Sequence, residues 1–267
     1  MRVLAGLVAS TLVLAAPAGS AGAVIDDTGA RIELAAPARR IVTLAPHATE
    51  LVYAAGAGDR LVAVESASDH PPAARDLPRI GGAGALDRER LLELEPDLVV
   101  AWHSGNRPAD LDWLARQGIA VYRTEPARLD DVAEAVRELG ELAHTRERAE
   151  RAAAAWETAL AHACRPAYAP RRALVVLWDR PLMVYGGAHW INEVLARAGY
   201  VNVFADVRRG VFSPSPEAVL AAGAQVGLTA TELEPGSLGV EQVRSLPQAA
   251  SRPSPRLAAV IRELCAR

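Results

Sequence analysis

Lysine is absent from this chain of 267 residues, and all 29 of its basic residues are arginine. We assign this bias to genome composition and draw no function from it. The net charge is -3 and the pI about 6.1, so no basic excess indicates a nucleic-acid partner. A hydrophobic content of 51% with a mean hydropathy of +0.09 excludes an intrinsically disordered chain. Internal repeats and low-complexity tracts are also missing.

An apolar run long enough to cross a bilayer is missing too, because such a run needs about 20 residues. The longest one, residues 3–16, follows Met1-Arg2 and precedes the small-residue site Ala21-Gly22-Ala23. This layout predicts a cleavable signal peptide over residues 1–23, with an uncleaved anchor or a buried helix as alternatives. No cysteine stands directly after the cleavage site, which argues against a lipid-anchored form. We expect a mature chain that starts near Val24 and is soluble outside the cytoplasm.

Cysteine is scarce, with Cys164 and Cys265 as the two examples. In an oxidising compartment such a pair can form a disulfide. The sequence does not show that the two Cα atoms come within about 7 Å of each other, as a disulfide requires. Two separate buried thiols remain the alternative.

Residues 39–127 alternate short apolar strands with helices. Strands are expected at 41–44, 61–64, 98–101 and 120–122, and helices at 47–55, 88–93 and 108–117. Asp87 is a suitable N-cap for the second helix. This alternation predicts a parallel sheet, and the lack of polar alternation in its strands indicates that both faces are covered.

A helical linker is expected over residues 128–165, followed by a second α/β lobe over 170–267. Val132, Val136 and Leu139 fall at helical spacing. Gly140 and the His144-Thr145 step interrupt the pattern, so the linker is one long helix or two nearly collinear ones. In the second lobe, strands are expected at 173–177 and 225–229, and helices at 190–198, 216–222 and 255–265.

Six short strings occur in a characteristic order: residues 40–51, 68–72, 94–102, 186–195, 201–204 and 254–256. Together they resemble the periplasmic substrate-binding proteins of ABC importers for iron–siderophore, haem and cobalamin. Residues 101–106 and 178–182 are most similar to the cobalamin-binding members. The resemblance covers roughly residues 39–267.

This resemblance implies an α/β fold of two Rossmann-like lobes joined by a long rigid helix, with the ligand in the cleft between them. It also implies a non-enzymatic, monomeric periplasmic protein that delivers cobalamin or a related corrinoid to the permease dimer of an ABC importer in the inner membrane. No cofactor other than this ligand, and no nucleic acid, is expected.

The expected ligand contacts are mostly aromatic, because a corrinoid is a large flat ring edged with amides. Open α/β sheets bind ligands in loops that leave the carboxyl ends of their strands. Trp102 and Trp178 each follow such a strand, although they could instead plug the core. Arg252 matches a family arginine that precedes the Ser-Pro-Arg turn. The full expected set is Trp102, Trp178, Tyr185, Phe212, His70 and Arg252.

One acidic residue per lobe is expected to dock on arginines of the permease. By the resemblance these are Glu89 and Glu217, each in the first turn of a helix. The helix dipole also favours an acid there, by about 0.3–1 kcal/mol, so capping is the alternative for each. Glu50 is interpreted as a cap or loop organiser.

Several positions depart from the family pattern. Two aromatic contacts fall on Ala67 and Ala83, a phenylalanine falls on Met183, and an aspartate before Arg252 has no match. Residues 248–250 stand where the family has a longer stretch with a final strand. We therefore expect the second lobe to lack an edge strand.

The alternatives are a haem- or siderophore-binding protein of the same fold, a metal-ion receptor and a secreted hydrolase. His47, His70, His103 and His189 could supply imidazoles to a metal, but no H-x-x-x-H or C-x-x-C spacing supports this. A hydrolase is the weakest alternative, since no G-x-S-x-G motif and no nucleophile–base set is present.

Overall fold

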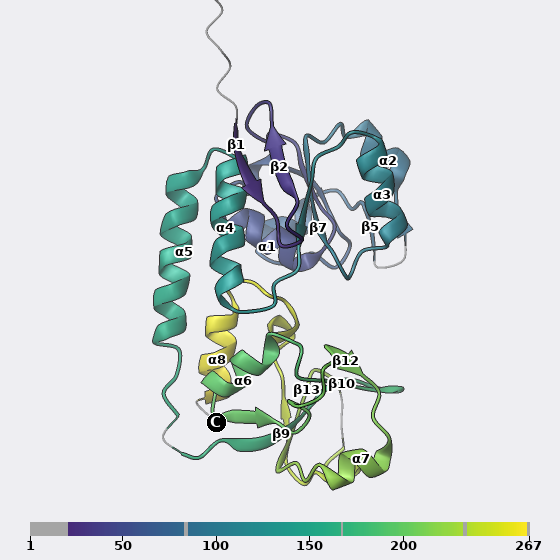
Figure 1. The fold of residues 1–267 in the computed structure, drawn as a ribbon, viewed down its shortest axis with the longest axis vertical. Helices are drawn as coiled ribbons and strands as arrows, with labels where there is room; N and C mark the ends of the chain where they lie inside the picture. The colour runs from purple at the N-terminus through teal and green to yellow at the C-terminus, as the bar shows by residue number, and fades with distance from the viewer. Residues whose placement is uncertain (1–20, 83–84, 167, 232–233, 266–267) are drawn as a thin grey trace, which may run out of the picture.

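The computed structural model describes residues 21–82, 85–166, 168–231 and 234–265. They form two α/β lobes, one above the other in Figure 1, with helices along one side. This is the predicted fold class. Within the described ranges, no helix combines the length and apolar character that a membrane span requires. Residues 1–20, which carry most of the predicted signal peptide, lie outside the described residues.

The first lobe is built on a four-stranded sheet with order β4-β3-β7-β8, parallel throughout as predicted. Its strands are β3 (Ile41–Thr43), β4 (Leu61–Val64), β7 (Leu98–Trp102) and β8 (Val121–Thr124). The helices between them are α1 (Pro46–Ala54), α2 (Arg88–Glu93) and α3 (Pro108–Arg116). Asp87 caps α2 by accepting a hydrogen bond from the Arg90 backbone N–H at 2.9 Å.

Small elements of this lobe were not predicted. The hairpin of β1 (Ala21–Ile25) and β2 (Arg31–Leu34) packs against the linker, and β5 (Gly81–Gly82) pairs with β6 (Ala85–Leu86). Two short 3-10 turns are η1 (Gly58–Arg60) and η2 (Pro72–Asp76). The predicted cleavage site, residues 21–23, lies within β1, and Val24 of the same strand is buried.

The second lobe has a mixed six-stranded sheet. Its strands are β9 (Arg171–Asp179), β10 (Leu182–Tyr185), β11 (Tyr200–Asn202), β12 (Val211–Phe212), β13 (Val226–Thr229) and β14 (Val243–Ser245). The Arg180-Pro181 turn between β9 and β10 is too short for a parallel crossover, so these strands pair antiparallel. The helical segments are α6 (Ile191–Arg197), α7 (Pro216–Ala221), η3 (Ser237–Gly239), η4 (Gln248–Ser251) and α8 (Leu257–Cys265).

The expectation that this lobe lacks an edge strand is wrong. Strand β14 occupies the edge and pairs parallel with β13, with Gly227 opposite Val243. It ends just before Leu246, so the shortened stretch forms the η4 turn that follows the strand.

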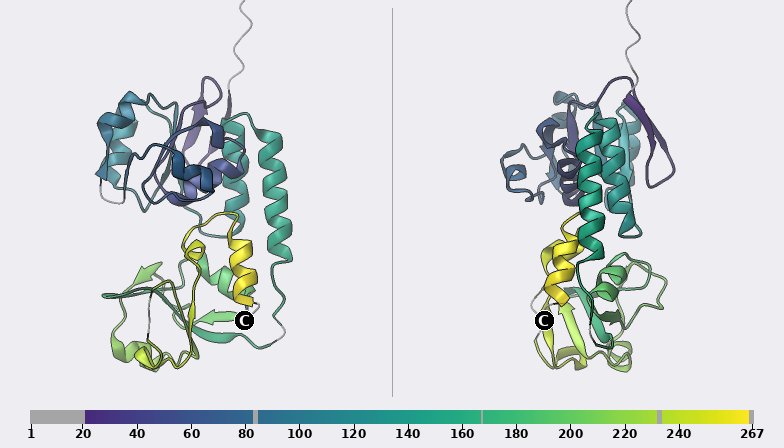
Figure 2. Two further views of the ribbon diagram at one scale, coloured as in Figure 1. Left: turned by 180° about the vertical axis from the view of Figure 1, so that it is seen from behind. Right: turned by 90° about the vertical axis from the view of Figure 1, so that its left-hand side faces the viewer.

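The linker contains two helices, α4 (Asp130–Leu142) and α5 (Arg146–Ala161). The prediction that they are one helix or nearly collinear is wrong. They pack side by side, and α5 continues toward the second lobe (Figures 1 and 2). His144 has a φ of 50°, and the Thr145 hydroxyl donates to the Ala55 carbonyl at 2.6 Å, which fixes the turn between the helices. A Cβ on Gly140 would lie 2.2 Å from the Ala149 Cβ, so this close packing needs glycine.

The largest apolar core runs from the first lobe through the linker into the second. It joins Ile41 and Leu51 to Val136 of α4, Trp156 of α5 and Ile261 of α8. Burial of apolar area contributes about 25 cal/mol per Å², so a core shared by both lobes resists their separation.

Candidate ligand-binding cleft

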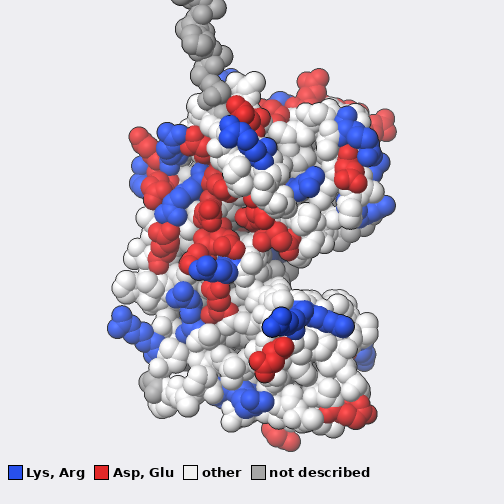
Figure 3. All heavy atoms as spheres, viewed as in Figure 1, with Lys and Arg blue, Asp and Glu red and all other residues white. Residues whose placement is uncertain are grey.

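A cleft of about 860 Å³ lies between the lobes and opens on the side away from α5, visible as the hollow at the right of Figure 3. Both lobes contribute to its walls. The first lobe contributes His47, Trp102, Ser104 and Glu125, and the second half of the chain contributes Tyr185, His189, Trp190, Glu193 and Arg252.

The first lobe presents an aromatic wall at the carboxyl end of its sheet. Trp102 is the last residue of β7 and is 39% exposed, which is unusual for tryptophan in a soluble protein. Its ring meets the His47 ring edge-on, with centroids 5.5 Å apart. His47 lies at the start of α1 and shares a 2.7 Å hydrogen bond between its Nε2 and the Thr124 hydroxyl. The tryptophan therefore sits on a buried polar support with one side open to the cleft.

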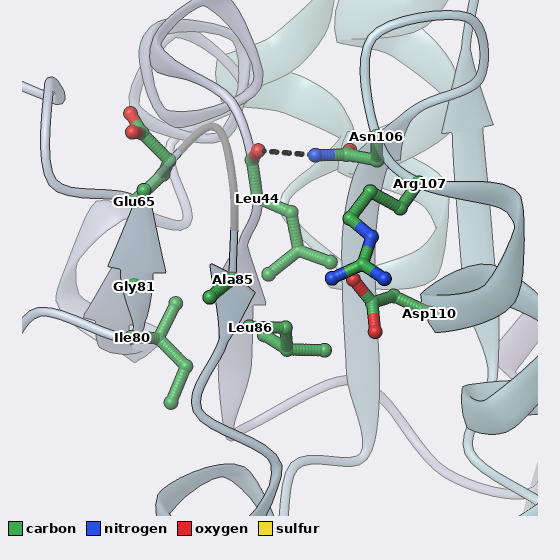
Figure 4. Close-up of a pocket in the computed structure, with 10 residues that line it drawn as sticks. Leu44, Glu65, Ile80, Gly81, Ala85, Leu86, Asn106, Arg107 and Asp110 are labelled. Atoms are coloured by element: carbon green, nitrogen blue, oxygen red, sulfur yellow. Dashed lines mark hydrogen bonds between the residues drawn. The ribbon is translucent and has the colours of Figure 1, made fainter.

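Asn106 holds the loop that carries Trp102. Its Oδ1 accepts a hydrogen bond from the Trp102 backbone N–H at 2.7 Å, and its Nδ2 donates to the Leu44 carbonyl at 2.9 Å. The second bond is drawn in Figure 4, where Asn106 lies at the edge of a small pocket of about 30 Å³. Asn106 thus ties the end of β7 to the end of β3, from which α1 and His47 follow.

The second lobe supplies the facing aromatic wall. Tyr185 ends β10 and stacks at a tilt on His189, with centroids 4.6 Å apart, and His189 in turn lies 4.7 Å from Trp190. Gly186 and Gly187, between Tyr185 and His189, pack closely against the loop after β11. A Cβ on Gly187 would lie 1.8 Å from the Ala205 carbonyl oxygen. Asn192 braces the turn by donating to the carbonyls of Gly186 at 2.8 Å and His189 at 2.9 Å.

Both cleft histidines are neutral at physiological pH. Burial, reinforced by the charge of Arg252, lowers the pKa of His47 to about 3. Burial also lowers the pKa of His189 to about 4. The Nδ1 atom of His189 accepts a hydrogen bond from the Ile191 backbone N–H at 3.1 Å, so the ring proton lies on Nε2. His189 can therefore offer a hydrogen bond to a ligand without adding charge.

Charged groups in the cleft already have partners. Arg252, 7% exposed, pairs with Glu50 at 3.3 Å and with Asp69, and donates to the Ala67 carbonyl. The Glu125 carboxylate accepts hydrogen bonds from the backbone N–H and hydroxyl of Ser104, at 2.8 and 2.9 Å. The cleft thus carries aromatic rings on both lobes, and these charged groups are already engaged in ion pairs or hydrogen bonds.

Three of the six predicted contacts, Trp102, Tyr185 and Arg252, line this cleft. The other three are not among its lining residues. Trp178 is 53% exposed at the β9–β10 turn and donates its Nε1–H to the Arg180 carbonyl. Phe212 turns into the second lobe and packs edge-on against Phe204 at 5.3 Å. His70 precedes a cis peptide bond to Pro71 on the η2 side of the first lobe.

Sequence reasoning missed Trp190 and considered His47 and His189 only as metal ligands. Trp190 stands directly before α6, inside the string 186–195, and its local sequence predicts a helix residue and not a cleft residue. Among the described residues, no group of three or more His, Cys, Asp or Glu side chains could hold a metal ion. Of the other departures, Ala67 contacts Arg252 through its carbonyl, and Ala83 lies outside the described residues.

Two further pairs of predicted residues are located by the fold. Glu89 and Glu217 are exposed, on α2 of the first lobe and α7 of the second. Cys164 and Cys265 form a disulfide with Cα atoms 6.0 Å apart, which ties the segment after α5 to the last turn of α8.

Comparisons with known proteins agree with this architecture. A family model described as periplasmic binding protein matches residues 41–254. The vitamin B12-binding protein of Vibrio cholerae (strain O395) is 35% identical over 245 residues, covering 86% of this chain and 88% of that protein. The crystal structure of the periplasmic vitamin B12 binding protein BtuF of Vibrio cholerae superposes with a TM-score of 0.77 at 33% identity, covering 86% of this chain and 96% of that one.

A second solved structure is also similar. The periplasmic heme-binding protein RhuT from Roseiflexus sp. RS-1, in its apo form, has a TM-score of 0.76 at 26% identity, covering 85% of this chain and 97% of that one. Because the family model spans most of the chain and the Vibrio cholerae relative covers 86% of it, this protein belongs to the periplasmic binding protein family.

Proposed function

We propose that this protein captures cobalamin or a related corrinoid in the cleft between its lobes and delivers it to the permease of an ABC importer. The observation that carries the proposal is the pair of facing aromatic walls, Trp102 on one lobe and the Tyr185–His189–Trp190 stack on the other. A corrin ring is flat and apolar on its faces and amide-rich at its edge, so it suits two aromatic walls with neutral hydrogen-bonding groups. The similarity to vitamin B12-binding proteins supports the same ligand.

Haem is the second candidate, because of the similarity to RhuT. Two features of the cleft favour a corrinoid over haem. The lone arginine among the described lining residues, Arg252, is already paired with Glu50 and Asp69, whereas haem propionates call for available cations. His189 carries its proton on Nε2, so in this tautomer it has no free nitrogen for an axial bond to iron.

Calorimetric titration of the mature protein with cyanocobalamin, and separately with haemin, tests the ligand. We expect tight one-to-one binding of cyanocobalamin. Trp102→Ala should weaken it at least tenfold, because aromatic stacking and the buried apolar area are lost. Trp178→Ala is the matched control, since Trp178 is an exposed tryptophan outside the cleft lining. Haemin binding with a shifted Soret band and no cobalamin signal would reassign the ligand to haem.

Delivery requires a docking face, and we propose that Glu89 and Glu217 provide its charged contacts. Both lie in the first turn of a short helix, one on each lobe, so together they suit a partner with two equivalent basic sites. The double change Glu89→Ala and Glu217→Ala should abolish permease binding while cyanocobalamin affinity stays normal. Loss of cyanocobalamin binding in that variant would contradict a role confined to docking.

The proposed role is non-enzymatic and periplasmic. Residues 1–23 would direct export and be removed, leaving a soluble monomer, as the small-residue site at 21–23 supports. Fractionation of cells, with mass spectrometry of the mature N-terminus, tests this. Recovery of an uncleaved chain in the cytoplasm would overturn the assignment.

A further inference from the structure

Helices α2 and α7 repeat one arrangement of residues in the two lobes. Each is six residues long and begins with a side chain that caps the backbone, from Asp87 in one and Ser215 in the other. Each has a glutamate at its second position, a buried apolar residue at its fourth and an exposed leucine at its fifth. These residues are Glu89, Leu91 and Leu92 in α2, and Glu217, Val219 and Leu220 in α7.

Leu92 and Leu220 are the two exposed leucines among the residues that the structure describes. Leu92 is 45% exposed and Leu220 is 60% exposed, whereas Leu91 and Val219 beside them are 0% and 2% exposed. In both helices the leucine follows the glutamate by three positions, so the two side chains lie on the same face. Each lobe therefore offers an apolar side chain directly beside an acidic one.

Both helices are held firmly, so these leucines are presented on fixed supports. Arg88 of α2 donates to buried Asp110 of α3 at 2.6 Å and lies over the Trp113 ring at 5.1 Å. In the second lobe, Arg172 of β9 donates to the Ala222 carbonyl at the end of α7 at 2.7 Å. The side chain of Leu220 lies over Gly239, where an added Cβ would approach its Cδ2 to 2.6 Å.

The two helices lie at the outer ends of the lobes, on the side toward which the cleft opens (Figures 1 and 3). A partner that receives a ligand from the cleft has to cover this same side. It would meet the α2 and α7 surfaces together, one on each flank of the opening.

We propose that Leu92 and Leu220 are paired apolar anchors for a two-fold symmetric membrane permease, each entering a socket that is an apolar depression next to a basic group. This rests on the proposed delivery function. It adds one apolar contact in each lobe to the acidic contact already proposed there. Charge selects the partner: the glutamates beside the leucines repel a second copy of the same face and an anionic lipid surface. Two identical acidic and apolar pairs fit a dimer with two identical sockets.

Site-specific photo-crosslinking in living cells tests the surface. A benzophenone amino acid replaces Leu92, Leu220 or, as the control, Val201, which is 40% exposed on β11 and belongs to neither helix. We expect positions 92 and 220 to capture the same membrane-spanning polypeptide and position 201 to capture none. Capture of another copy of this chain, of two different polypeptides, or of nothing at 92 and 220 would overturn the proposal.

Affinity measurements separate this proposal from the function it rests on. The captured permease complex, in lipid nanodiscs, is titrated with wild-type protein and with Leu92→Ser, Leu220→Ser, the double variant and Val201→Ser. We expect each leucine change to weaken binding about tenfold, the double change about a hundredfold and Val201→Ser not at all. Wild-type affinity in the double variant would refute the anchors.

Cyanocobalamin titration of the same variants completes the test. Unchanged binding in the leucine variants supports a role in docking alone, and reduced binding would overturn it. If wild-type protein itself fails to bind cyanocobalamin while the leucine changes still weaken permease binding, the ligand proposed above is wrong and the anchors stand.

Discussion

The carboxylate of Glu50, on α1 of the first lobe, forms a buried ion pair with Arg252, which precedes α8, at 3.3 Å between Oε1 and Nη1. The same carboxylate accepts hydrogen bonds from the Ser254 hydroxyl at 2.6 Å and from Arg256 at 3.1 Å. Glu50 is 4% exposed. This one buried carboxylate therefore binds the segment 252–256, which follows the last strand of the second lobe, to helix α1 of the first lobe. That role is larger than the capping of a single helix.

Removing this carboxylate should destabilise the protein strongly. Glu50→Ala leaves Asp69 as the remaining carboxylate partner of buried Arg252 and removes the acceptor of the Ser254 hydroxyl, so we expect a loss of about 3 kcal/mol in the free energy of unfolding. Urea denaturation measures it. Glu50→Gln is the control, because it preserves volume and one acceptor and should lose less. Equal stability of all three proteins would show that the network does not hold the lobes together.

Asn106 should affect the ligand through Trp102. Asn106→Ala removes the hydrogen bonds that join the Trp102 loop to Leu44, each worth about 1 kcal/mol, so we expect cyanocobalamin affinity to fall about five- to tenfold. Calorimetry of the single and double variants forms a mutant cycle. If Asn106 acts by positioning Trp102, adding Asn106→Ala to Trp102→Ala should cost nothing more. Fully additive losses would argue for an independent role.

The acidic surface over α4, red in Figure 3, should make stability depend on pH. Burial raises the pKa of Glu138 to about 7 from its usual 4.5, and the charges of Glu134, Asp27 and Asp26 add to this despite the hydrogen bond that Tyr122 donates. Burial likewise raises the pKa of Asp27 to about 6. The folded state thus holds protons that the unfolded state has released, so stability falls as pH rises from about 4.5 to about 7.

Glu138→Gln should flatten this dependence, because it keeps an acceptor for Tyr122 and removes the charge. Allowing for the partial solvent exposure of Glu138, we expect wild-type protein to lose about 1–2 kcal/mol between about pH 5 and pH 8 through this group. Urea denaturation at the two pH values measures the loss. A variant that keeps the full wild-type slope would contradict the assignment to Glu138.

The disulfide should contribute to stability by restricting the unfolded chain. Cys164 and Cys265 are separated by 101 residues. Removing a disulfide typically lowers the free energy of unfolding by about 2–4 kcal/mol, because the unfolded chain gains conformational freedom. The double change Cys164→Ser and Cys265→Ser should lower the free energy of unfolding by this amount. Reductant should lower the stability of wild-type protein to the same level and leave the variant unchanged. A wild-type protein indifferent to reductant would count against a formed disulfide.

Much of the first lobe could be predicted because its signals are local. The β7 run from Leu98 ends at Trp102, and α2 starts at the cap Asp87, both as expected. Strands of two residues, such as β12, have too short an apolar pattern to be recognised. The reversal at His144 escaped prediction because the Thr145–Ala55 hydrogen bond and the Gly140–Ala149 contact stabilise it across the packed helices.

Apolar periodicity, capping and ordered strings of residues predict the two α/β lobes, the helical character of the linker and the family, because each of these signals can be read along the chain. Which aromatic residues share the cleft depends instead on the tertiary structure. Trp102 and Trp178 have the same local signal, a tryptophan at a strand end, yet only Trp102 lines the cleft. Trp178, next to the β9–β10 turn, is exposed outside the cleft lining. Trp190, directly before α6, lines the cleft. Which side chains face each other across a cleft depends on strand pairing and lobe packing, which no local pattern contains.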